Sequence, residues 1–343
     1  MDFEIGKIRF GRKSPPVIIG EIGINHGGSL DVAKQMVKSA SVAGLKIIKH
    51  QTHIIEDEMI PLAQKTIPGN SDKSIYEIMN ECALNEEEEF ELFEYSKSLG
   101  LEFISTPFSR AAADRLHKFG VNGFKIGSGE CNNLPLVDHI ASFGKPIILS
   151  TGMNDMNSVQ TTVNLIKDRV PIALLHTTNL YPTPSNLVRL GAMEKLANKF
   201  SNIPYGLSDH TLNNLSSLGA IAKGATIIER HYTDNKKRKG PDIICSMDEK
   251  EARELVSYSL ELFSMLGGEK EPAKEEEVTI NFAFSSVVSI KEIKKGDKLS
   301  RENIWVKRPG TGQIKASEFE KLIGKTAVKD IRNNTQLKLN DFK

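Results

Sequence analysis

Short apolar segments and amphipathic segments alternate along the first 268 residues of this chain. The apolar segments are rich in valine, isoleucine and phenylalanine and end in polar residues, which is typical of strands in a buried parallel sheet. They begin at or near Val17, Ile47, Phe103, Phe124, Ile147, Ala173, Pro204 and Thr226. A segment with helical spacing follows each strand; the first spans Leu30–Ala43 and the last spans about Asp248–Leu266.

Eight strand–helix units over roughly 250 residues predict a (β/α)₈ TIM barrel, because alternating strands and helices form parallel sheets with right-handed crossovers. The active site of such a barrel lies at the C-terminal ends of the strands, where the polar residues of this chain fall. A doubly wound sheet is the alternative, but Gly27-Gly28 lacks the spacing of a dinucleotide-binding turn. We therefore expect an α/β protein whose catalytic barrel spans residues 1–268.

Three segments of the barrel region need separate interpretation. The connection 53–84, which contains Pro68-Gly69, is longer than an ordinary barrel connection and is expected to form a lid or a wall of the pocket. The acidic run Glu86–Glu89 is expected to be the first turn of a helix capped by Asn85 rather than a binding tract. The basic run Lys236–Lys239 is expected to be a solvated loop rather than a nucleic-acid patch.

The composition changes after Gly267-Gly268. Residues 269–281 are highly charged and are expected to form a linker. From residue 282 to residue 343 the pattern is one of short β runs and turns, such as Val287–Ile290 and Ile304–Val306. About sixty residues give little core, so this small β-rich module is expected to lean on another surface.

The overall composition indicates an enzyme-sized cytoplasmic protein. Lysine and arginine total 45 against 44 aspartate and glutamate, so no global field favours nucleic acid or an anionic membrane. The sequence contains no apolar run that could span a membrane, and its first twelve residues do not resemble a signal peptide. Three widely separated cysteines argue against a disulfide framework and against a zinc cluster.

Two histidines stand at the ends of successive predicted strands. His210 follows Gly206–Asp209, and His231 follows Ile228–Arg230. Two such imidazoles could share one divalent ion, with Asp209 and Glu229 as acid–base partners or partners of the ligands. Imidazole ligands favour a transition metal such as Mn²⁺, Co²⁺ or Zn²⁺ over Mg²⁺. We expect a divalent cofactor, first of all Mn²⁺, with Co²⁺ or Mg²⁺ as alternatives.

Cations, hydroxyls and carboxylates gather at the same predicted strand ends. The donors are Lys49, Thr106, Lys125, Ser128, Ser150, Asn179 and Ser208. The carboxylates are Glu21, Glu130, Glu229 and Asp242. Such a donor set suits a phosphate, whose oxygens need several charge-assisted hydrogen bonds. Beside a metal that polarises a carbonyl, the set predicts metal-assisted carbon–carbon chemistry on a phosphate ester.

Ordered motifs along nearly the whole chain resemble the sialic acid synthase family. In the first half they are Glu21-Ile22-Gly23-Ile24-Asn25-His26, Lys49-His50-Gln51-Thr52, Ser105-Thr106-Pro107-Phe108, Lys125-Ile126-Gly127-Ser128-Gly129-Glu130 and Ser150-Thr151-Gly152-Met153. In the second half they are Tyr181-Pro182-Thr183-Pro184, Ser208-Asp209-His210-Thr211, Glu229-Arg230-His231 and Gly240-Pro241-Asp242. The tail from Phe282 resembles that family's antifreeze-like (SAF) domain, and the chain most resembles the bacterial branch that makes N-acetylneuraminate.

The resemblance implies a transferase of sialic acid biosynthesis that condenses phosphoenolpyruvate with the open-chain aldehyde of N-acetylmannosamine and releases phosphate. It implies that His210 and His231 hold the metal. It implies that phosphoenolpyruvate is bound by Lys49, Thr106, Lys125, Ser128, Ser150, Asn179 and Ser208. It further implies catalytic residues, with Glu21, Gln51 and Asp242 at the sugar or the metal's water shell and Glu130 and Glu229 as acid–base candidates. Tyr232, where relatives often carry phenylalanine, should leave the chemistry intact.

Two further residues are expected to bind the sugar. By the resemblance, Tyr181 meets it from the barrel. Arg308, in the motif Lys307-Arg308-Pro309-Gly310, meets its N-acetyl group from the C-terminal domain of the partner subunit in a domain-swapped homodimer.

Three alternatives remain open from the sequence. A lysine at a barrel strand end also suits a Schiff-base sialic acid aldolase that acts through pyruvate. The acceptor could be a different amino sugar, as in legionaminic or pseudaminic acid synthesis, or a 6-phosphate sugar. The tail alone resembles an ice-binding protein, so a non-enzymatic binding module is the third alternative.

Overall fold

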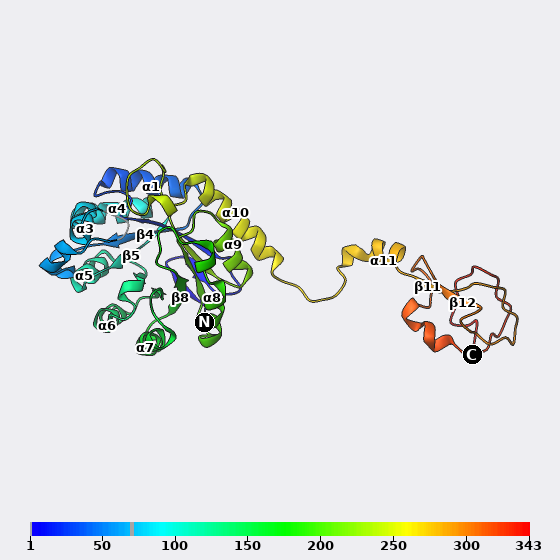
Figure 1. Cartoon of the computed structure of the whole chain (residues 1–343). Coiled ribbons are helices and arrows are strands. Elements are labelled where there is room, and N and C mark those ends of the chain that lie inside the picture. The colour runs from blue at the N-terminus through cyan, green and yellow to red at the C-terminus, as the bar shows by residue number, and fades with distance from the viewer. Residues whose placement is uncertain (1, 69–71) are drawn as a thin grey trace. The chain divides into compact units, whose positions relative to one another are not determined.

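The computed structural model describes residues 2–68 and 72–343, which form two compact units (Figure 1). The first unit ends at Gly267 and the second runs from Gly268 to Lys343. Gly69, within the long connection that the sequence analysis singled out, lies outside the described residues together with its two successors. No described helix is long and apolar enough to cross a membrane.

The first unit is a (β/α)₈ barrel, as predicted. Its strands are β3 (Val17–Gly23), β4 (Ile47–Thr52), β5 (Glu102–Pro107), β6 (Phe124–Ile126), β7 (Ile147–Ser150), β8 (Ile172–Thr177), β9 (Tyr205–Asp209) and β10 (Ile227–His231). They pair in parallel in the order β5-β4-β3-β10-β9-β8-β7-β6, and β5 and β6 at the ends of this order are also in contact. The closed arrangement brings the C-terminal ends of all eight strands to one mouth.

Helices surround the strands (Figure 1). They are α1 (Leu30–Val42), α2 (Ile55–Glu58), α3 (Ile75–Cys82), α4 (Glu86–Ser98), α5 (Arg110–Phe119), α6 (Leu134–Ser142), α7 (Met156–Ile166), α8 (Leu190–Lys199), α9 (Leu215–Ala222) and α10 (Glu249–Met265). Asn85 caps α4 and exchanges hydrogen bonds with Glu88, which confirms that the acidic run is a helix start. The basic run is loop: Lys236 pairs with Glu251, and Arg238 pairs with Asp234.

The core of the barrel lies in two layers. The larger layer fills the space between strands and helices and includes Met36, Phe103 and Leu207. The smaller layer fills the barrel interior below the mouth. The N-terminal hairpin of β1 (Phe3–Ile5) and β2 (Ile8–Phe10) packs its buried apolar side chains into this inner layer. Because one end of the barrel is filled with apolar side chains, polar chemistry is confined to the C-terminal mouth.

The second unit is built around one antiparallel pair of strands. Strands β11 (Ser286–Ser289) and β12 (Ile304–Lys307) pair over a compact apolar core that includes Val287, Ile304 and Leu337. The segment predicted to be a charged linker contains a 3-10 turn (Lys274–Glu276) and most of the short helix α11 (Glu277–Ala283). The C-terminal end of α11 belongs to the second unit, because the backbone N–H of Gly310 donates to the carbonyl of Asn281.

Candidate active site

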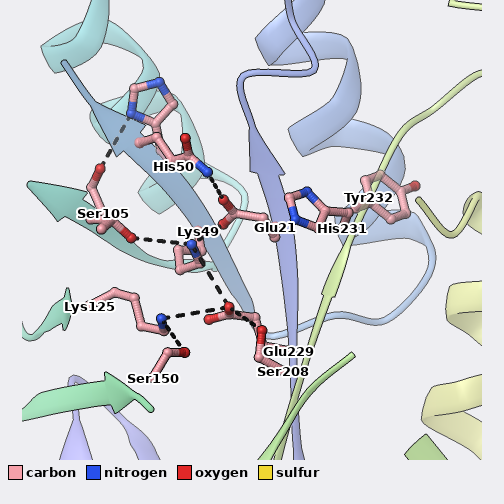
Figure 2. A network of polar contacts seen from close by, with 12 residues as sticks. Glu21, Lys49, His50, Ser105, Lys125, Ser150, Ser208, Glu229, His231 and Tyr232 are labelled. Atoms are coloured by element: carbon pink, nitrogen blue, oxygen red, sulfur yellow. Dashed lines mark hydrogen bonds and ion pairs between the residues drawn. The ribbon is translucent and has the colours of Figure 1, made fainter. Parts of the chain in front are cut away.

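Two lysines and two glutamates form a buried charge cluster at the mouth of the barrel (Figure 2). Glu21 on β3 lies 2.6 Å from the Nζ of Lys49 on β4. Glu229 on β10 lies 4.0 Å from that Nζ and 3.8 Å from the Nζ of Lys125 on β6. All four side chains are at most 7% exposed. Four strands therefore contribute one charge each to a water-poor site, where electrostatic interactions are strong.

Burial and neighbouring charges separate the pKa values of these groups. Burial alone would raise the pKa of Glu229, but Lys125 and Lys49 outweigh it and hold that pKa below its usual range. Burial raises the pKa of Glu21 to about 7, opposed by Lys49. Burial lowers the pKa of Lys125 to about 8, whereas Glu21 and Glu229 keep the pKa of Lys49 above its usual value. One carboxylate thus stays ionised while the other can gain or lose a proton near neutral pH.

Hydroxyl groups adjoin the two lysines and Glu229. Lys125 Nζ donates to Ser150 Oγ at 2.7 Å, and Lys49 Nζ donates to Thr106 Oγ1 at 3.2 Å. Ser208 Oγ donates to Glu229 Oε1 at 3.1 Å. The structure therefore gathers these predicted donors around the charge cluster.

A small cradle lies between the ends of β7 and β8. The backbone N–H of Gly152 donates to Ser128 Oγ at 3.1 Å. A Cβ at Gly152 would stand 1.9 Å from Asn179 Oδ1 and 2.8 Å from Ser128 Oγ, so only glycine fits. Asn179 Oδ1 and Thr177 Oγ1 are buried without a hydrogen-bond partner among the described residues. Unpartnered buried polar atoms are costly, so this cradle is suited to a polar ligand. The Thr177 hydroxyl can donate a hydrogen bond to such a ligand, whereas Asn179 Oδ1 can only accept one.

The paired histidines lie beside the cluster. The ring centroids of His210 and His231 are 5.4 Å apart. His210 Nδ1 donates to the carbonyl of Thr178 at 3.0 Å, which leaves Nε2 as the free lone pair. Burial lowers the pKa of His210 to about 4 and that of His231 to about 3, so both rings are neutral at physiological pH.

This donor set fits a divalent metal. Neutral imidazoles are the form that binds metals, and His231 Nδ1 is buried without a hydrogen-bond partner in the described structure. No group of three or more histidine, cysteine, aspartate or glutamate residues in positions 2–68 and 72–343 is arranged to hold a metal. The protein would therefore supply the two imidazoles and leave the remaining positions to water or substrate, as catalytic metal sites do.

Polar side chains also face the histidines from neighbouring loops. Tyr181 stacks on His210 with ring centroids 4.1 Å apart, and Asp242 Oδ2 lies 3.7 Å from His231 Nδ1. Burial raises the pKa of Asp242 to about 6. Gln51 Nε2 donates to Glu21 Oε1 at 2.8 Å, and Gln51 Oε1 lies 3.3 Å from His53 Nε2. The structure thus connects the predicted catalytic residues Glu21 and Gln51 and places Asp242 beside His231.

A cavity of about 540 Å³ lies over these groups. Its lining includes Gln51, Asn179, Tyr181, His231 and Asp242, and residues of the long connection between β4 and α4 form one wall. The expectation that this connection forms a wall of the pocket is therefore confirmed. The cavity volume lies within the range of small-molecule sites.

Three residues that were predicted to belong to the site lie outside the charge cluster. Asp209 was predicted to be an acid–base partner or a partner of the metal ligands, but its carboxylate accepts hydrogen bonds from the Oγ atoms of Ser216 and Ser217 instead. Alternation along β9 turns Asp209 outward while Ser208 faces inward. Glu130 accepts a hydrogen bond from Asn133 and is half-buried, apart from the charge cluster. Arg308 belongs to the second unit, where it is exposed and its guanidinium lies 5.7 Å from the ring centroid of Phe282.

The residues that complete the cradle had no role predicted from the sequence. Thr177 and Gly152 lie within strand-end motifs, but only the structure shows that they complete the cradle. Tyr232 is turned away from the cluster (Figure 2), and its hydroxyl donates to Ser39 Oγ at 2.7 Å. Its phenolic oxygen therefore serves packing behind β10 rather than the site.

Both units of the chain match known protein families. A profile of the NeuB family matches residues 36–271, and a profile of the SAF domain matches residues 284–343. The chain is 40% identical to an uncharacterised protein of Methanocaldococcus jannaschii, over 90% of this chain and 89% of that protein. It is 35% identical to the N,N'-diacetyllegionaminic acid synthase of Campylobacter jejuni, over 93% of this chain and 97% of the relative.

A solved crystal structure also has a similar fold. The crystal structure of N-acetylneuraminic acid synthetase from Leptospira borgpetersenii superposes with a TM-score of 0.74 and 31% identity. The match covers 82% of this chain and 95% of that chain.

Proposed function

The chain belongs to the NeuB family, and we propose that it condenses phosphoenolpyruvate with the open-chain aldehyde of an N-acetylated amino sugar, releasing phosphate. The observation that carries this proposal is the meeting of two buried lysines, a polar cradle and two neutral histidines at one barrel mouth. An anionic phosphate ester and a metal-activated carbonyl are the two partners that such a site can hold side by side.

Phosphoenolpyruvate is held by the lysine side of the site. Lys125 and Lys49 supply the charge, while the hydroxyls of Ser150, Ser128 and Thr177 supply neutral hydrogen bonds. The bound anion would compete with Glu229 for both lysines. The ionised Glu229 would then be less tightly paired with the two lysines and would lie beside the reacting enol.

The aldehyde is held by the histidine side. A divalent metal on His210 and His231 would polarise the aldehyde oxygen. Carbon 3 of phosphoenolpyruvate forms the new bond to the aldehyde carbon, and the aldehyde oxygen takes a proton. Glu21 is suited to that proton transfer, because its pKa is raised to about 7 by burial. Gln51 fixes the Glu21 carboxylate through a 2.8 Å hydrogen bond.

The second half of the reaction replaces phosphate by water. The condensation leaves a cationic carbon 2, to which water adds while a carboxylate takes its proton. Glu229 stays ionised beside the two lysines and is suited to stabilise this cation and accept that proton. The tetrahedral intermediate then breaks its C–O bond and expels phosphate, giving a keto acid three carbons longer than the sugar.

The direct test is phosphate release from phosphoenolpyruvate with a panel of mannosamine derivatives. We expect phosphate and the elongated keto acid in equal amounts with at least one N-acetylated sugar. No phosphate release with any member of the panel would reject the proposed reaction.

One observation favours a second candidate, the Schiff-base aldolase. Burial lowers the pKa of Lys125 to about 8, and a depressed pKa is what an amine nucleophile needs. Borohydride reduction in the presence of pyruvate separates the two functions. A stable adduct on Lys125 would support the aldolase, whereas the condensation with phosphoenolpyruvate predicts none.

The pH dependence of kcat/KM for phosphoenolpyruvate should follow the protonation state of Lys125. Its ammonium form binds the substrate anion, and its pKa is about 8, so kcat/KM for phosphoenolpyruvate should fall as pH rises above about 8. At saturating phosphoenolpyruvate the bound anion holds the proton on Lys125, so kcat should fall only at higher pH. An alkaline limb that appears equally in both profiles would contradict this assignment.

The role of Arg308 is proposed from the resemblance: the second unit of one subunit would complete the active site of its partner. Arg308→Ala and His231→Ala should each be nearly inactive alone, because each lacks one part in every site. Coexpressed, half of the randomly paired dimers are mixed and each has one complete site, so about a quarter of the wild-type activity should return. Failure of isolated mixed dimers to recover activity would contradict an exchange between subunits.

A further inference from the structure

A chain of hydrogen bonds leads from the charge cluster into the long connection between β4 and α4. Gln51 Nε2 donates to Glu21 Oε1 at 2.8 Å, and Gln51 Oε1 lies 3.3 Å from His53 Nε2. His53 Nδ1 in turn lies 2.8 Å from Glu58 Oε2. Two side chains that the proposed reaction does not use are therefore linked to Glu21, the carboxylate proposed to transfer a proton to the aldehyde oxygen.

The hydrogen-bonding capacity of each group sets the direction of these contacts. The ionised carboxylate of Glu21 can only accept, so it faces the amide nitrogen of Gln51, and the amide oxygen faces His53. This oxygen also only accepts, so His53 Nε2 has to donate to it. The carboxylate of Glu58 makes the same demand on His53 Nδ1. A ring protonated at both nitrogens satisfies both neighbours, with Glu58 as its counter-charge.

Packing holds both His53 and the helix that carries Glu58. The side chain of His53 is 1% exposed, and its ring stacks on Phe108 with centroids 4.5 Å apart. Glu58 is the last residue of α2, and this helix is tied to the first turn of α5, where the backbone N–H of Ala111 donates to Asp57 Oδ2 at 2.8 Å. The ring and the carboxylate are thus fixed by neighbours outside the charge cluster, which is what the support of a catalytic group requires.

We propose that His53 and Glu58 are positioning residues for the condensation, which hold the Gln51 amide in one orientation and thereby fix the Glu21 carboxylate for proton transfer. This proposal rests on the proposed function. Without a donor at His53 Nε2, nothing in the chain of contacts would keep the amide oxygen of Gln51 turned away from Glu21. With that oxygen turned inward, Gln51 would repel the ionised carboxylate instead of donating to it.

Steady-state kinetics with a sugar that supports phosphate release test the role of His53. His53→Leu removes the donor, so kcat should fall at least about tenfold, whereas KM for phosphoenolpyruvate should change less than about threefold because Lys49 and Lys125 are untouched. His117→Leu is the matched control, because His117 is exposed and stacks on Phe143 as His53 stacks on Phe108. It should leave kcat unchanged. Wild-type kcat in a folded His53→Leu protein would overturn the proposal.

A double-mutant cycle separates positioning from general damage to the fold. If His53 acts through Gln51, its loss has nothing left to disturb once Gln51 is replaced by alanine. The kcat of the double variant, Gln51→Ala with His53→Leu, should therefore equal that of Gln51→Ala within about twofold. Losses that multiply in the double variant would show that His53 acts independently of Gln51 and would overturn the proposal.

Glu58→Gln extends the test and decides it if His53→Leu does not fold. This variant keeps the shape of the side chain and removes the counter-charge of His53, so kcat should fall at least about threefold, and this loss should vanish in the Gln51→Ala background. Glu56→Gln makes the same change at an exposed position of α2 and should leave kcat unchanged. Wild-type kcat in Glu58→Gln would overturn the proposal while the condensation stands. A wild-type protein that releases no phosphate with any sugar would reject the condensation itself.

Discussion

Chelation of divalent metal should abolish turnover of the purified protein, and Mn²⁺ or Co²⁺ should restore it. Two neutral imidazoles lie at the barrel mouth with ring centroids 5.4 Å apart, on the side where the proposed reaction needs the aldehyde oxygen to be polarised. The metal would supply this electrophilic assistance. Full activity in protein freed of metal would contradict the assignment.

Variants of the two histidines separate metal binding from folding. His210→Ala and His231→Ala should fold normally, lose the bound metal and lose activity. Both imidazoles are neutral and sit at strand ends, so their removal leaves no buried charge unpaired. His139→Ala, at a partly exposed position on α6, is the matched control and should keep metal and activity. Metal content measured per chain is the readout.

Replacing Lys49 or Lys125 by methionine should weaken phosphoenolpyruvate binding at least tenfold. Each change removes a charge from a desolvated anion site, where a hydrogen bond to a charged group contributes about 1.5–3 kcal/mol. The KM for the sugar should change less, because the proposed reaction places the sugar on the histidine side. Lys118→Met removes an exposed ammonium and serves as the control. Wild-type kinetics for phosphoenolpyruvate in both variants would place the phosphate elsewhere.

The barrel could be predicted because its strands are buried on both faces. Such strands appear in the sequence as short continuous apolar runs. The polar residues toward their ends, such as Lys49, Lys125 and His231, indicated where the mouth of the barrel lies. The N-terminal hairpin was not predicted, because two strands of three residues carry too little pattern.

The sequence could predict which residues form the site, but it could not predict how they are arranged. Asp209 was misplaced because its position next to His210 in sequence concealed the alternation of side chains along β9. The cradle at Gly152 depends on contacts between separate strands, which no local pattern reveals. The different pKa values of Glu21 and Glu229 depend on how many lysines each contacts, which is likewise a property of the folded barrel.

In the proposed reaction, phosphate leaves by cleavage of the C–O bond after the new C–C bond has formed. Phosphoenolpyruvate labelled with heavy oxygen at its bridging position tests this directly, with both products analysed by mass spectrometry after reaction with the preferred amino sugar. We expect the label to leave with phosphate and an elongated keto acid to form in equal amount. Label retained in the keto acid, or phosphate released without any elongated product, would contradict it.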